Sequence, residues 1–354
     1  MRILHLHTHL SIGGGTTVVT ELAAAQMRLG HEVTIATVSP KAPLDDWVRS
    51  QGIEVLNMGC GGTFRGRFQA IDHILRNRQF DVVNEHWEMW FVGALAALKN
   101  RISFVHTYHG NPGRRYFLTQ GLACLFTDKV VLLTPAADEY MLKWVRPSRR
   151  KIEVIPNGIR LDHLDGATRV EVDGIPVDAP VVGMVARIDP QKDLGTFIRA
   201  AKLINARWPE VHFVAVGDGP QRGMYEDLAK TIGVANFHFL GRRNDVPSLL
   251  RRMNVNVLAT HYEALPTVLL EGMASGCVCA ASDIPSNRYA LDEGRAGLLY
   301  PHRSPEALAN AIERLLSDQA LADRFRAHAI ERVKYFNSER MAEDYIKLYT
   351  TLLK

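Results

Sequence analysis

The stretch Ala259–Gly276, which reads A-T-H-Y-E-A-L-P-T-V-L-L-E-G-M-A-S-G, decides the fold of this chain. The run just before it, Val255–Leu258, is short and β-branched, which is typical of a buried strand. Pro266 suits the first turn of a helix, because its missing N–H costs nothing there, and Gly276 suits the helix end. The stretch therefore predicts a strand, a short loop and a helix.

Two carboxylates lie eight residues apart on this unit, with Glu263 in the loop and Glu271 inside the helix. The helix N-terminus near Leu265–Val268 presents free N–H groups and a partial positive charge, which suit a diphosphate. A carboxylate can also accept hydrogen bonds from two neighbouring hydroxyls, as on a ribose or hexose. The alternative is a helix cap at Glu263 and a solvated Glu271, although the apolar segment Leu269–Ala274 is unusual for a charge.

The motif resembles the E-x7-E signature of the family 4 glycosyltransferases, which are retaining enzymes of the GT-B fold. The family usually has glycine where this chain has Ala264, whereas the spacing of the two glutamates and the proline match. The resemblance implies an α/β fold of two Rossmann-like, doubly wound parallel-sheet domains that face an inter-domain cleft. It also implies that Glu263 contacts the donor sugar and that Glu271 contacts the ribose.

Strand and helix patterns alternate from end to end, and 354 residues suit two domains, so we expect two parallel sheets with helices on both faces. We place an N-terminal, acceptor-binding domain at residues 1–160 and a C-terminal, donor-binding domain at residues 161–337. The polar stretch 160–179 is interpreted as a linker. The last helix, about 338–354, has an apolar stripe; it packs on the second domain in the simplest interpretation and on the first domain in the resembled fold, which we adopt.

The expected strands were located by their apolar, β-branched runs. They are Ile3–His7, Glu32–Thr37, Ile53–Met58, Asp81–Asn84, Ser103–Thr107, Lys129–Leu133, Ile152–Ile155, Val181–Val185, His212–Val216, Phe237–Gly241, Val255–Leu258 and Gly297–Tyr300.

Charge is uneven along the chain, because residues 1–160 hold 19 Lys and Arg against 13 Asp and Glu, a net +6, while the whole chain carries +4. A basic first domain fits an anionic partner such as a phospholipid surface, with uneven solubilising charge as the alternative; it is too weak a signal for nucleic acid. The aromatic and basic cluster Phe64–Phe68 fits the same membrane surface or a solvated face.

The four cysteines form no C-x-x-C pair and resemble reduced core thiols, and a strand pattern follows Met1 directly, so we expect no signal peptide. The expected location is the cytoplasm, with peripheral contact to the inner face of the membrane.

In the first domain, the contiguous glycines of the loop Ser11–Gly15 allow close approach of the backbone to a ligand, or form a tight turn. Members of the resembled family carry a similar glycine pair facing the cleft, which points to Gly14 and Gly15. His109 ends the fifth strand, where open α/β sheets face their ligand, and the matching family position is a histidine near the donor sugar. His106 points to the other face and is interpreted as structural.

In the second domain, Arg187 and Lys192 follow a strand in A-R-I-D-P-Q-K-D, which resembles the family segment G-R-L-x-x-x-K-G. Two cations at that place can clamp a diphosphate. Gly217 belongs to another family-like turn, and Leu240 lies where the family places the nucleobase. No D-x-D cluster is present to hold a metal between phosphates, so the two cations are expected to replace it.

The predicted reaction is retaining transfer of a sugar from a UDP- or GDP-sugar to a glycan or lipid-linked acceptor, in polysaccharide or glycolipid biosynthesis, without a metal or other cofactor. The alternatives are a sugar-nucleotide epimerase and a non-catalytic sugar-nucleotide-binding protein, neither of which forms a product of donor sugar and acceptor. The candidate catalytic residues are Glu263, His109, Arg187 and Lys192. The candidate donor-binding residues are Gly14, Gly15, Arg187, Lys192, Gly217, Leu240, Glu263, Leu265, Pro266, Thr267 and Glu271.

Overall fold

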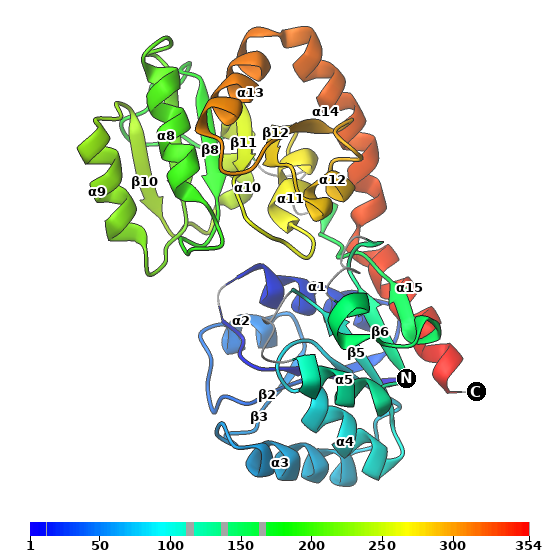
Figure 1. The fold of residues 1–354 in the computed structure, drawn as a ribbon. Helices are drawn as coiled ribbons and strands as arrows, with labels where there is room; N and C mark the ends of the chain where they lie inside the picture. The colour runs from blue at the N-terminus through cyan, green and yellow to red at the C-terminus, as the bar shows by residue number, and fades with distance from the viewer. Residues whose placement is uncertain (12, 111–116, 136–140, 163–167, 354) are drawn as a thin grey trace. The chain divides into compact units, whose positions relative to one another are not determined.

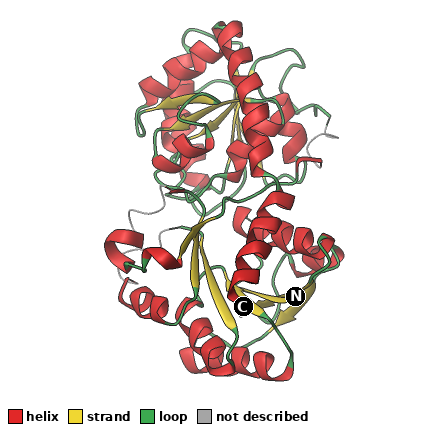
Figure 2. Cartoon of the chain, turned by 90° about the vertical axis from the view of Figure 1, so that its right-hand side faces the viewer, coloured by secondary structure: helices red, strands yellow, loops and turns green. Residues whose placement is uncertain are grey.

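The computed structural model describes residues 1–11, 13–110, 117–135, 141–162 and 168–353. They form two compact units, one of Met1–Ile159 with Phe336–Lys354 and one of Arg160–Tyr335, here called unit 1 and unit 2. Each unit is built on one parallel sheet between layers of helices (Figures 1 and 2). The expectation of two doubly wound parallel sheets is therefore confirmed.

The sheet of unit 1 has the strand order β3-β2-β1-β4-β5-β6-β7. Strands β2 and β3 are added on one side of β1, and strands β4 to β7 on the other, so the strand order reverses between β1 and β4. Its strands are mostly buried on both faces, which is why they are near-continuous apolar runs in the sequence. The strands are β1 (Arg2–His7), β2 (Glu32–Thr37), β3 (Glu54–Asn57), β4 (Val82–Glu85), β5 (Ser103–Tyr108), β6 (Lys129–Leu132) and β7 (Ile152–Val154).

Helices cover both faces of this sheet. α1 and α15 pack on one face around Ile3 and Ile35, and α3, α4 and α5 pack on the other around Leu4 and Leu6. The helical segments of unit 1 are α1 (Gly14–Arg28), α2 (Asp45–Ser50), α3 (Phe64–Asn77), α4 (Trp90–Asn100), α5 (Phe117–Leu125), the π-helical turn η3 (Met141–Val145), the 3₁₀ turn η4 (Arg149–Lys151) and α15 (Ser338–Leu352).

The C-terminal helix α15 belongs to unit 1. Its apolar stripe joins the core of α1, and Arg28 of α1 pairs with Glu339 at 2.7 Å. Two of its tyrosines reach the sheet, since the Tyr349 hydroxyl accepts a hydrogen bond from Asn84 (2.7 Å) and the Tyr345 hydroxyl bonds Thr107 (2.9 Å). An isolated parallel β-bridge joins Ile159, which follows β7, to Asn337, which precedes α15. The bridge connects the two places where the chain leaves and re-enters unit 1.

Unit 2 repeats the same winding with six parallel strands in the order β10-β9-β8-β11-β12-β13, reversing between β8 and β11. α8, α9 and α13 cover one face of its sheet, and α10 and α11 cover the other. The strands are β8 (Val181–Val185), β9 (His212–Val216), β10 (Phe237–Gly241), β11 (Val255–Leu258), β12 (Val278–Ser282) and β13 (Gly297–Tyr300). The helices are α8 (Leu194–Asn205), α9 (Arg222–Ile232), α10 (Val246–Arg252), α11 (Thr267–Ala274), α12 (Pro285–Ala290), α13 (Pro305–Ser317), α14 (Gln319–Val333) and the 3₁₀ turn η5 (Lys334–Phe336).

Three local expectations need correction. Gly14 and Gly15 are the first residues of α1 rather than loop residues, and α11 begins at Thr267 with Pro266 as its N-cap. Part of the expected linker belongs to the core, because Val172 and Ile175 are buried against α10. Burial of these two apolar side chains stabilises this position of the segment, although the residues around them are polar. Residues 163–167 of that linker, and Lys354 of the last helix, lie outside the described residues.

Candidate functional site

In unit 2, the loop after β8 is organised by Asp189, a buried carboxylate that the sequence reasoning missed. Its Oδ1 accepts hydrogen bonds from the backbone N–H groups of Gln191 (3.0 Å) and Lys192 (3.2 Å). Its Oδ2 accepts a hydrogen bond from Arg187 Nε at 2.7 Å and forms an ion pair with Nη2 of the same guanidinium at 2.6 Å. The carboxylate thus closes the loop as an Asx-type turn and steadies Arg187, whose side chain remains 69% exposed.

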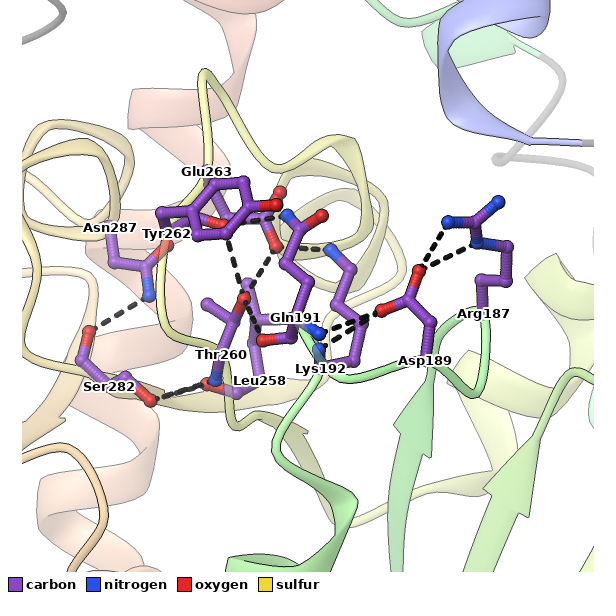
Figure 3. Close-up of polar contacts among 10 residues, drawn as sticks. All are labelled: Arg187, Asp189, Gln191, Lys192, Leu258, Thr260, Tyr262, Glu263, Ser282 and Asn287. Carbon is purple, nitrogen blue, oxygen red and sulfur yellow. Dashed lines mark hydrogen bonds and ion pairs between the residues drawn. The ribbon is translucent and has the colours of Figure 1, made fainter. Parts of the chain in front are cut away.

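The second cation of this loop is joined to the loop that follows β11 (Figure 3). Lys192 forms an ion pair with Oε1 of Glu263, and the two side chains are only 17% and 10% exposed. The Thr260 hydroxyl lies 3.0 Å from the same oxygen, and the N–H of His261 donates to the carbonyl of Gln191 at 3.0 Å. Because Oε1 already contacts a cation and a hydroxyl, Glu263 is better suited to hold its neighbours and a ligand than to act as a nucleophile.

Two glycines let the loop after β9 pack directly on the Arg187 loop. A Cβ at Gly217 would lie 2.0 Å from the carbonyl oxygen of Ala186, and a Cβ at Gly219 would lie 2.2 Å from that of Ile188. Ala186 and Ile188 in turn donate backbone hydrogen bonds to this segment, at 2.9 Å and 3.0 Å. Any side chain at either glycine would push the two loops apart. Gly217, a predicted donor-binding residue, is thus part of the support of the Arg187 loop.

The helix α11 carries the second carboxylate of the motif. The N–H groups of Thr267 and Val268 at its start have no carbonyl of a preceding helical turn to bond, whereas that of Leu269 bonds the carbonyl of Pro266 at 3.1 Å. Further along the helix, burial raises the pKa of Glu271 to about 7. Among the described residues, the structure shows no hydrogen bond or ion pair to its carboxylate. Ionising a carboxyl with so raised a pKa is costly, and two hydroxyl donors would relieve the cost.

Leu265 and Pro266, two more predicted donor-binding residues, are buried where the β11 loop enters α11. Leu240 is partly buried in β10, whose end residue Gly241 accepts a hydrogen bond from the N–H of Gly217 at 2.8 Å. The loops after β8, β9, β10 and β11 therefore meet at the carboxyl edge of the sheet, around the point where the strand order reverses. Ligands of open α/β sheets bind at that place.

In unit 1, the corresponding edge carries histidines and a tryptophan. His109 follows β5, and its ring stacks on the indole of Trp87 at a centroid distance of 5.1 Å. A Cβ at Gly15 would lie 2.9 Å from the same indole, so this glycine leaves the space that Trp87 occupies. The turn after β4 is held by Glu85, which accepts backbone hydrogen bonds from Trp87 (2.6 Å) and Met89 (2.8 Å).

His106 lies in the core, as its position in the strand predicts. Its Nδ1 bonds Oε2 of Glu85 at 2.7 Å, and its ring stacks on Trp90 at 3.7 Å. His109 is instead partly exposed and bonds His86, with 3.0 Å between His109 Nε2 and His86 Nδ1. Sequence reasoning missed Asp189, Thr260 and the histidine partners. The Asp-Pro at 189–190 was a usable turn signal for Asp189, and Thr260 lies only three residues before Glu263. The histidine partners, in contrast, depend on contacts distant in sequence.

Two family models match this chain and together span most of it. The model described as "Glycosyltransferase Family 4" matches residues 12–163, and the model "Glycosyl transferases group 1" matches residues 168–332. The chain belongs to the family 4 glycosyltransferases. It is a glycosyltransferase of the GT-B fold, as the E-x7-E motif predicted.

Curated relatives agree with this placement of the glycosyltransferase. It is 27% identical to the phosphatidyl-myo-inositol mannosyltransferase of Mycolicibacterium smegmatis, over 96% of this chain and 90% of the relative. It is 28% identical to the UDP-Gal:alpha-D-GlcNAc-diphosphoundecaprenol alpha-1,3-galactosyltransferase of Escherichia coli, over 70% and 69%.

Solved structures show the same fold. A glycosyltransferase of Rickettsia africae matches with a TM-score of 0.85 at 20% identity, covering 100% of this chain and 98% of that one. Anabaena HepE in complex with UDP-glucose matches with a TM-score of 0.86 at 17% identity, covering 99% and 100%.

In the described part of the glycosyltransferase, no helix has the length and apolar character needed to cross a bilayer.

Proposed function

We propose that this glycosyltransferase takes its sugar from a nucleoside diphosphate sugar, retains the anomeric configuration and needs no metal ion. The observation that carries the proposal is the grouping of Arg187, Lys192, Glu263 and the first turn of α11 at the carboxyl edge of unit 2. The leaving diphosphate gains charge as the sugar departs, and a guanidinium and helix N–H groups can stabilise that charge. Uracil is the favoured base, because relatives and structural neighbours carry UDP or UDP-sugars in their names.

Each residue of unit 2 receives one part in this proposal. Arg187, the more exposed cation, binds the diphosphate, while Lys192 fixes Glu263 against the sugar. Glu271 accepts hydrogen bonds from the ribose hydroxyls, which explains why a carboxyl whose pKa is raised by burial has no hydrogen-bond partner among the described residues. Leu240 and Gly217 border the base and the phosphates. In unit 1, His109 contacts the donor sugar; this assignment rests on the family resemblance.

The proposed acceptor is lipid-linked or a glycan, reached by peripheral contact with the cytoplasmic face of a membrane. Two of the curated relatives act on acceptors whose names include a lipid, phosphatidyl-myo-inositol and diphosphoundecaprenol. The basic first half of the chain, with net charge +6 over residues 1–160, supports attraction to anionic lipid. The aromatic and basic cluster at Phe64–Phe68 begins helix α3, and the Phe64 side chain is 52% exposed there.

Product formation is the test. Radiolabelled UDP- and GDP-sugars are incubated with the enzyme and with vesicles that contain phosphatidylinositol or a diphosphoundecaprenol-linked sugar, with and without EDTA. The expected result is one labelled lipid whose yield is unchanged by EDTA and lost in the Arg187→Met variant. An α-linked product from an α-linked donor, determined by NMR of the anomeric proton, shows retention. Loss of product with EDTA, or an inverted anomer, contradicts the corresponding part of the proposal.

The epimerase and the non-catalytic alternatives gain no support from the family models or the curated relatives. The same assay separates them from a transferase. An epimerase converts the donor without an acceptor, and a binding protein leaves the donor intact in every reaction.

A further inference from the structure

A chain of three histidines crosses the carboxyl edge of the unit 1 sheet and ends at a glutamine of helix α1. His5 lies in β1, His86 follows β4 and His109 follows β5, and these three strands are neighbours. His109 Nε2 lies 3.0 Å from His86 Nδ1, and His86 Nε2 lies 2.8 Å from His5 Nδ1. His5 Nε2 in turn lies 2.8 Å from the side-chain oxygen of Gln26. Of the four, only His109 is partly exposed, and its Nδ1 takes no part in the chain.

The three imidazoles are neutral at physiological pH. Burial lowers the pKa of His5 to about 4, and burial together with the neighbouring histidines lowers the pKa of His86 well below its usual range. The pKa of His109 is lowered to about 3, first by its enclosure and then by His7 and His106. A neutral imidazole has one N–H and one acceptor nitrogen, so each ring in such a chain donates at one end and accepts at the other.

The Gln26 amide presents its carbonyl oxygen to His5. An amide oxygen only accepts hydrogen bonds, so this orientation of the amide sets the direction of the whole chain, and the tautomer of His109 in the wild type tests it. His5 must then donate from Nε2 to Gln26, which leaves its Nδ1 as an acceptor. His86 therefore donates from Nε2 to His5 and accepts at Nδ1, and His109 donates from Nε2 to His86. The remaining nitrogen, His109 Nδ1, is left without a proton.

We propose that Gln26, His5 and His86 are positioning residues that fix the tautomer of His109, so that its Nδ1 is a hydrogen-bond acceptor for a hydroxyl group of the bound sugar. The part about the sugar rests on the proposed function, whereas the tautomer itself is a property of the ligand-free protein. A ring that can only accept selects a ligand with a donor at that point, because a ligand group that only accepts leaves two lone pairs facing each other. A fully buried amide in helix α1 thereby sets the hydrogen-bonding character of a residue at the edge of the sheet.

The direction of the chain is expected to reverse when Gln26 can no longer accept. In a Gln26→Met variant, the present direction would leave the N–H of His5 buried without a partner. Reversal would leave only an unpaired lone pair there, which is the less costly of the two. Gln26→Glu keeps an acceptor of the same shape and is expected to keep the direction. Thr20→Val is the matched control, because Thr20 is also buried in α1 but, among the residues that the structure describes, its hydroxyl bonds only the carbonyl of Thr16, at 2.8 Å.

The experiment is long-range ¹H–¹⁵N NMR of ligand-free protein labelled with ¹⁵N-histidine, in which protonated and unprotonated ring nitrogens have different shifts. A His109→Gln spectrum identifies the signals of His109. We expect wild type, Gln26→Glu and Thr20→Val to show an unprotonated His109 Nδ1, and Gln26→Met to show a protonated one, with His5 and His86 reversing together. A protonated Nδ1 in wild type, or a Gln26→Met spectrum with unchanged His109 signals, would overturn the proposal.

The functional readout is the split between kcat and KM with the UDP- or GDP-sugar that the wild type consumes in the product assay. Gln26→Met is expected to lower kcat/KM at least about tenfold, since a wrong histidine tautomer is costly wherever the ring must accept a proton or hydrogen bond. Gln26→Glu restores it, and Thr20→Val leaves it unchanged. Reversed tautomers with an unchanged kcat/KM would overturn the assignment of His109 to the sugar. They would leave the transfer reaction intact, because product formed by the wild type tests that reaction separately.

Discussion

Glu271 provides the sharpest test of the donor site, because its two proposed properties predict opposite effects of one substitution. Burial raises the pKa of this carboxyl from 4.5 to about 7 in the folded chain. Between these two values the folded chain holds a proton that the unfolded chain has released. Stability therefore falls as the pH rises through this window, and the full cost is present at pH 8.

The size of that cost follows from the shift. Each unit of pKa corresponds to about 1.4 kcal/mol, so the shift amounts to about 3 kcal/mol as an upper value, and partial exposure of the side chain reduces it toward about 1 kcal/mol. Glu271→Gln cannot ionise and is expected to recover this energy at pH 8. The melting temperature of the ligand-free protein should then rise by about 3 to 9 °C at pH 8 and should be nearly unchanged at pH 4.5.

The same substitution should weaken nucleotide binding. A carboxylate that accepts two ribose hydroxyls makes charge-assisted hydrogen bonds, and its replacement by an amide is expected to weaken the binding of UDP or GDP about tenfold to a hundredfold. Wild-type affinity should also fall about tenfold from pH 8 to pH 6, as Glu271 takes up its proton, and this dependence should be absent from the variant.

Calorimetry measures both effects, by scanning for stability and by titration with UDP and GDP for affinity. Glu226→Gln is the control, because Glu226 belongs to the same unit but is a partly exposed partner of Arg222 at 2.8 Å, where a change of under about 1 kcal/mol is expected. A Glu271→Gln protein that is no more stable at pH 8 than wild type would refute the argument from burial. Unchanged nucleotide affinity would refute the ribose assignment, even with the stability gain present.

Three further substitutions and one control, Gly223→Ala, test the residues that support the carboxyl edges of the two sheets. Gly219→Ala should destabilise unit 2 by about 1–3 kcal/mol, because the new methyl group would overlap the carbonyl oxygen of Ile188. Gly223→Ala in α9 is the control; open space surrounds this glycine, so the substitution should be neutral or stabilising in the same thermal scans. Asp189→Asn should lower kcat/KM about tenfold by releasing Arg187, with only a small change in KM for the acceptor, as steady-state kinetics would show. Gly15→Ala should displace the indole of Trp87 and shift tryptophan fluorescence to longer wavelength; an unchanged spectrum would mean that the ring has another position available.

The predictable part of the fold rests on local signals. Strand runs such as Val181–Val185 and His212–Val216 coincide with β8 and β9, because buried parallel strands are continuous apolar runs whatever their neighbours are. Helix ends followed equally local chemistry, as with Gly276, whose positive φ of 74° fits the position after α11. The linker was harder, because Val172 and Ile175 are isolated apolar residues in a polar stretch and only the folded core shows what they pack against.

The candidate site divides in the same way. The E-x7-E spacing and the two cations were predicted from the sequence. The structure brings Lys192 and Glu263, 71 residues apart, into one ion pair. No sequence pattern predicts that pair or the histidine chain, whose members His5 and His86 are 81 residues apart. Such contacts arise from the order of the strands in the sheet. They become predictable only after that order is known, because neighbouring strands place their carboxyl ends side by side.

Both cations at the carboxyl edge of unit 2 are paired with carboxylates, Arg187 with Asp189 and Lys192 with Glu263. Each pair is nearly neutral, so the electrostatic repulsion between the two cations is small. The two pairs differ in exposure. The Arg187 side chain is 69% exposed, and an exposed ion pair contributes little, about 0–1 kcal/mol, so a diphosphate can recruit this guanidinium at small cost. The enclosed Lys192 pair is costly to break, because separation leaves a buried charge without its partner. In the proposed donor site, charge for the diphosphate would therefore come mainly from Arg187 and the first turn of α11, while Lys192 keeps Glu263 in place.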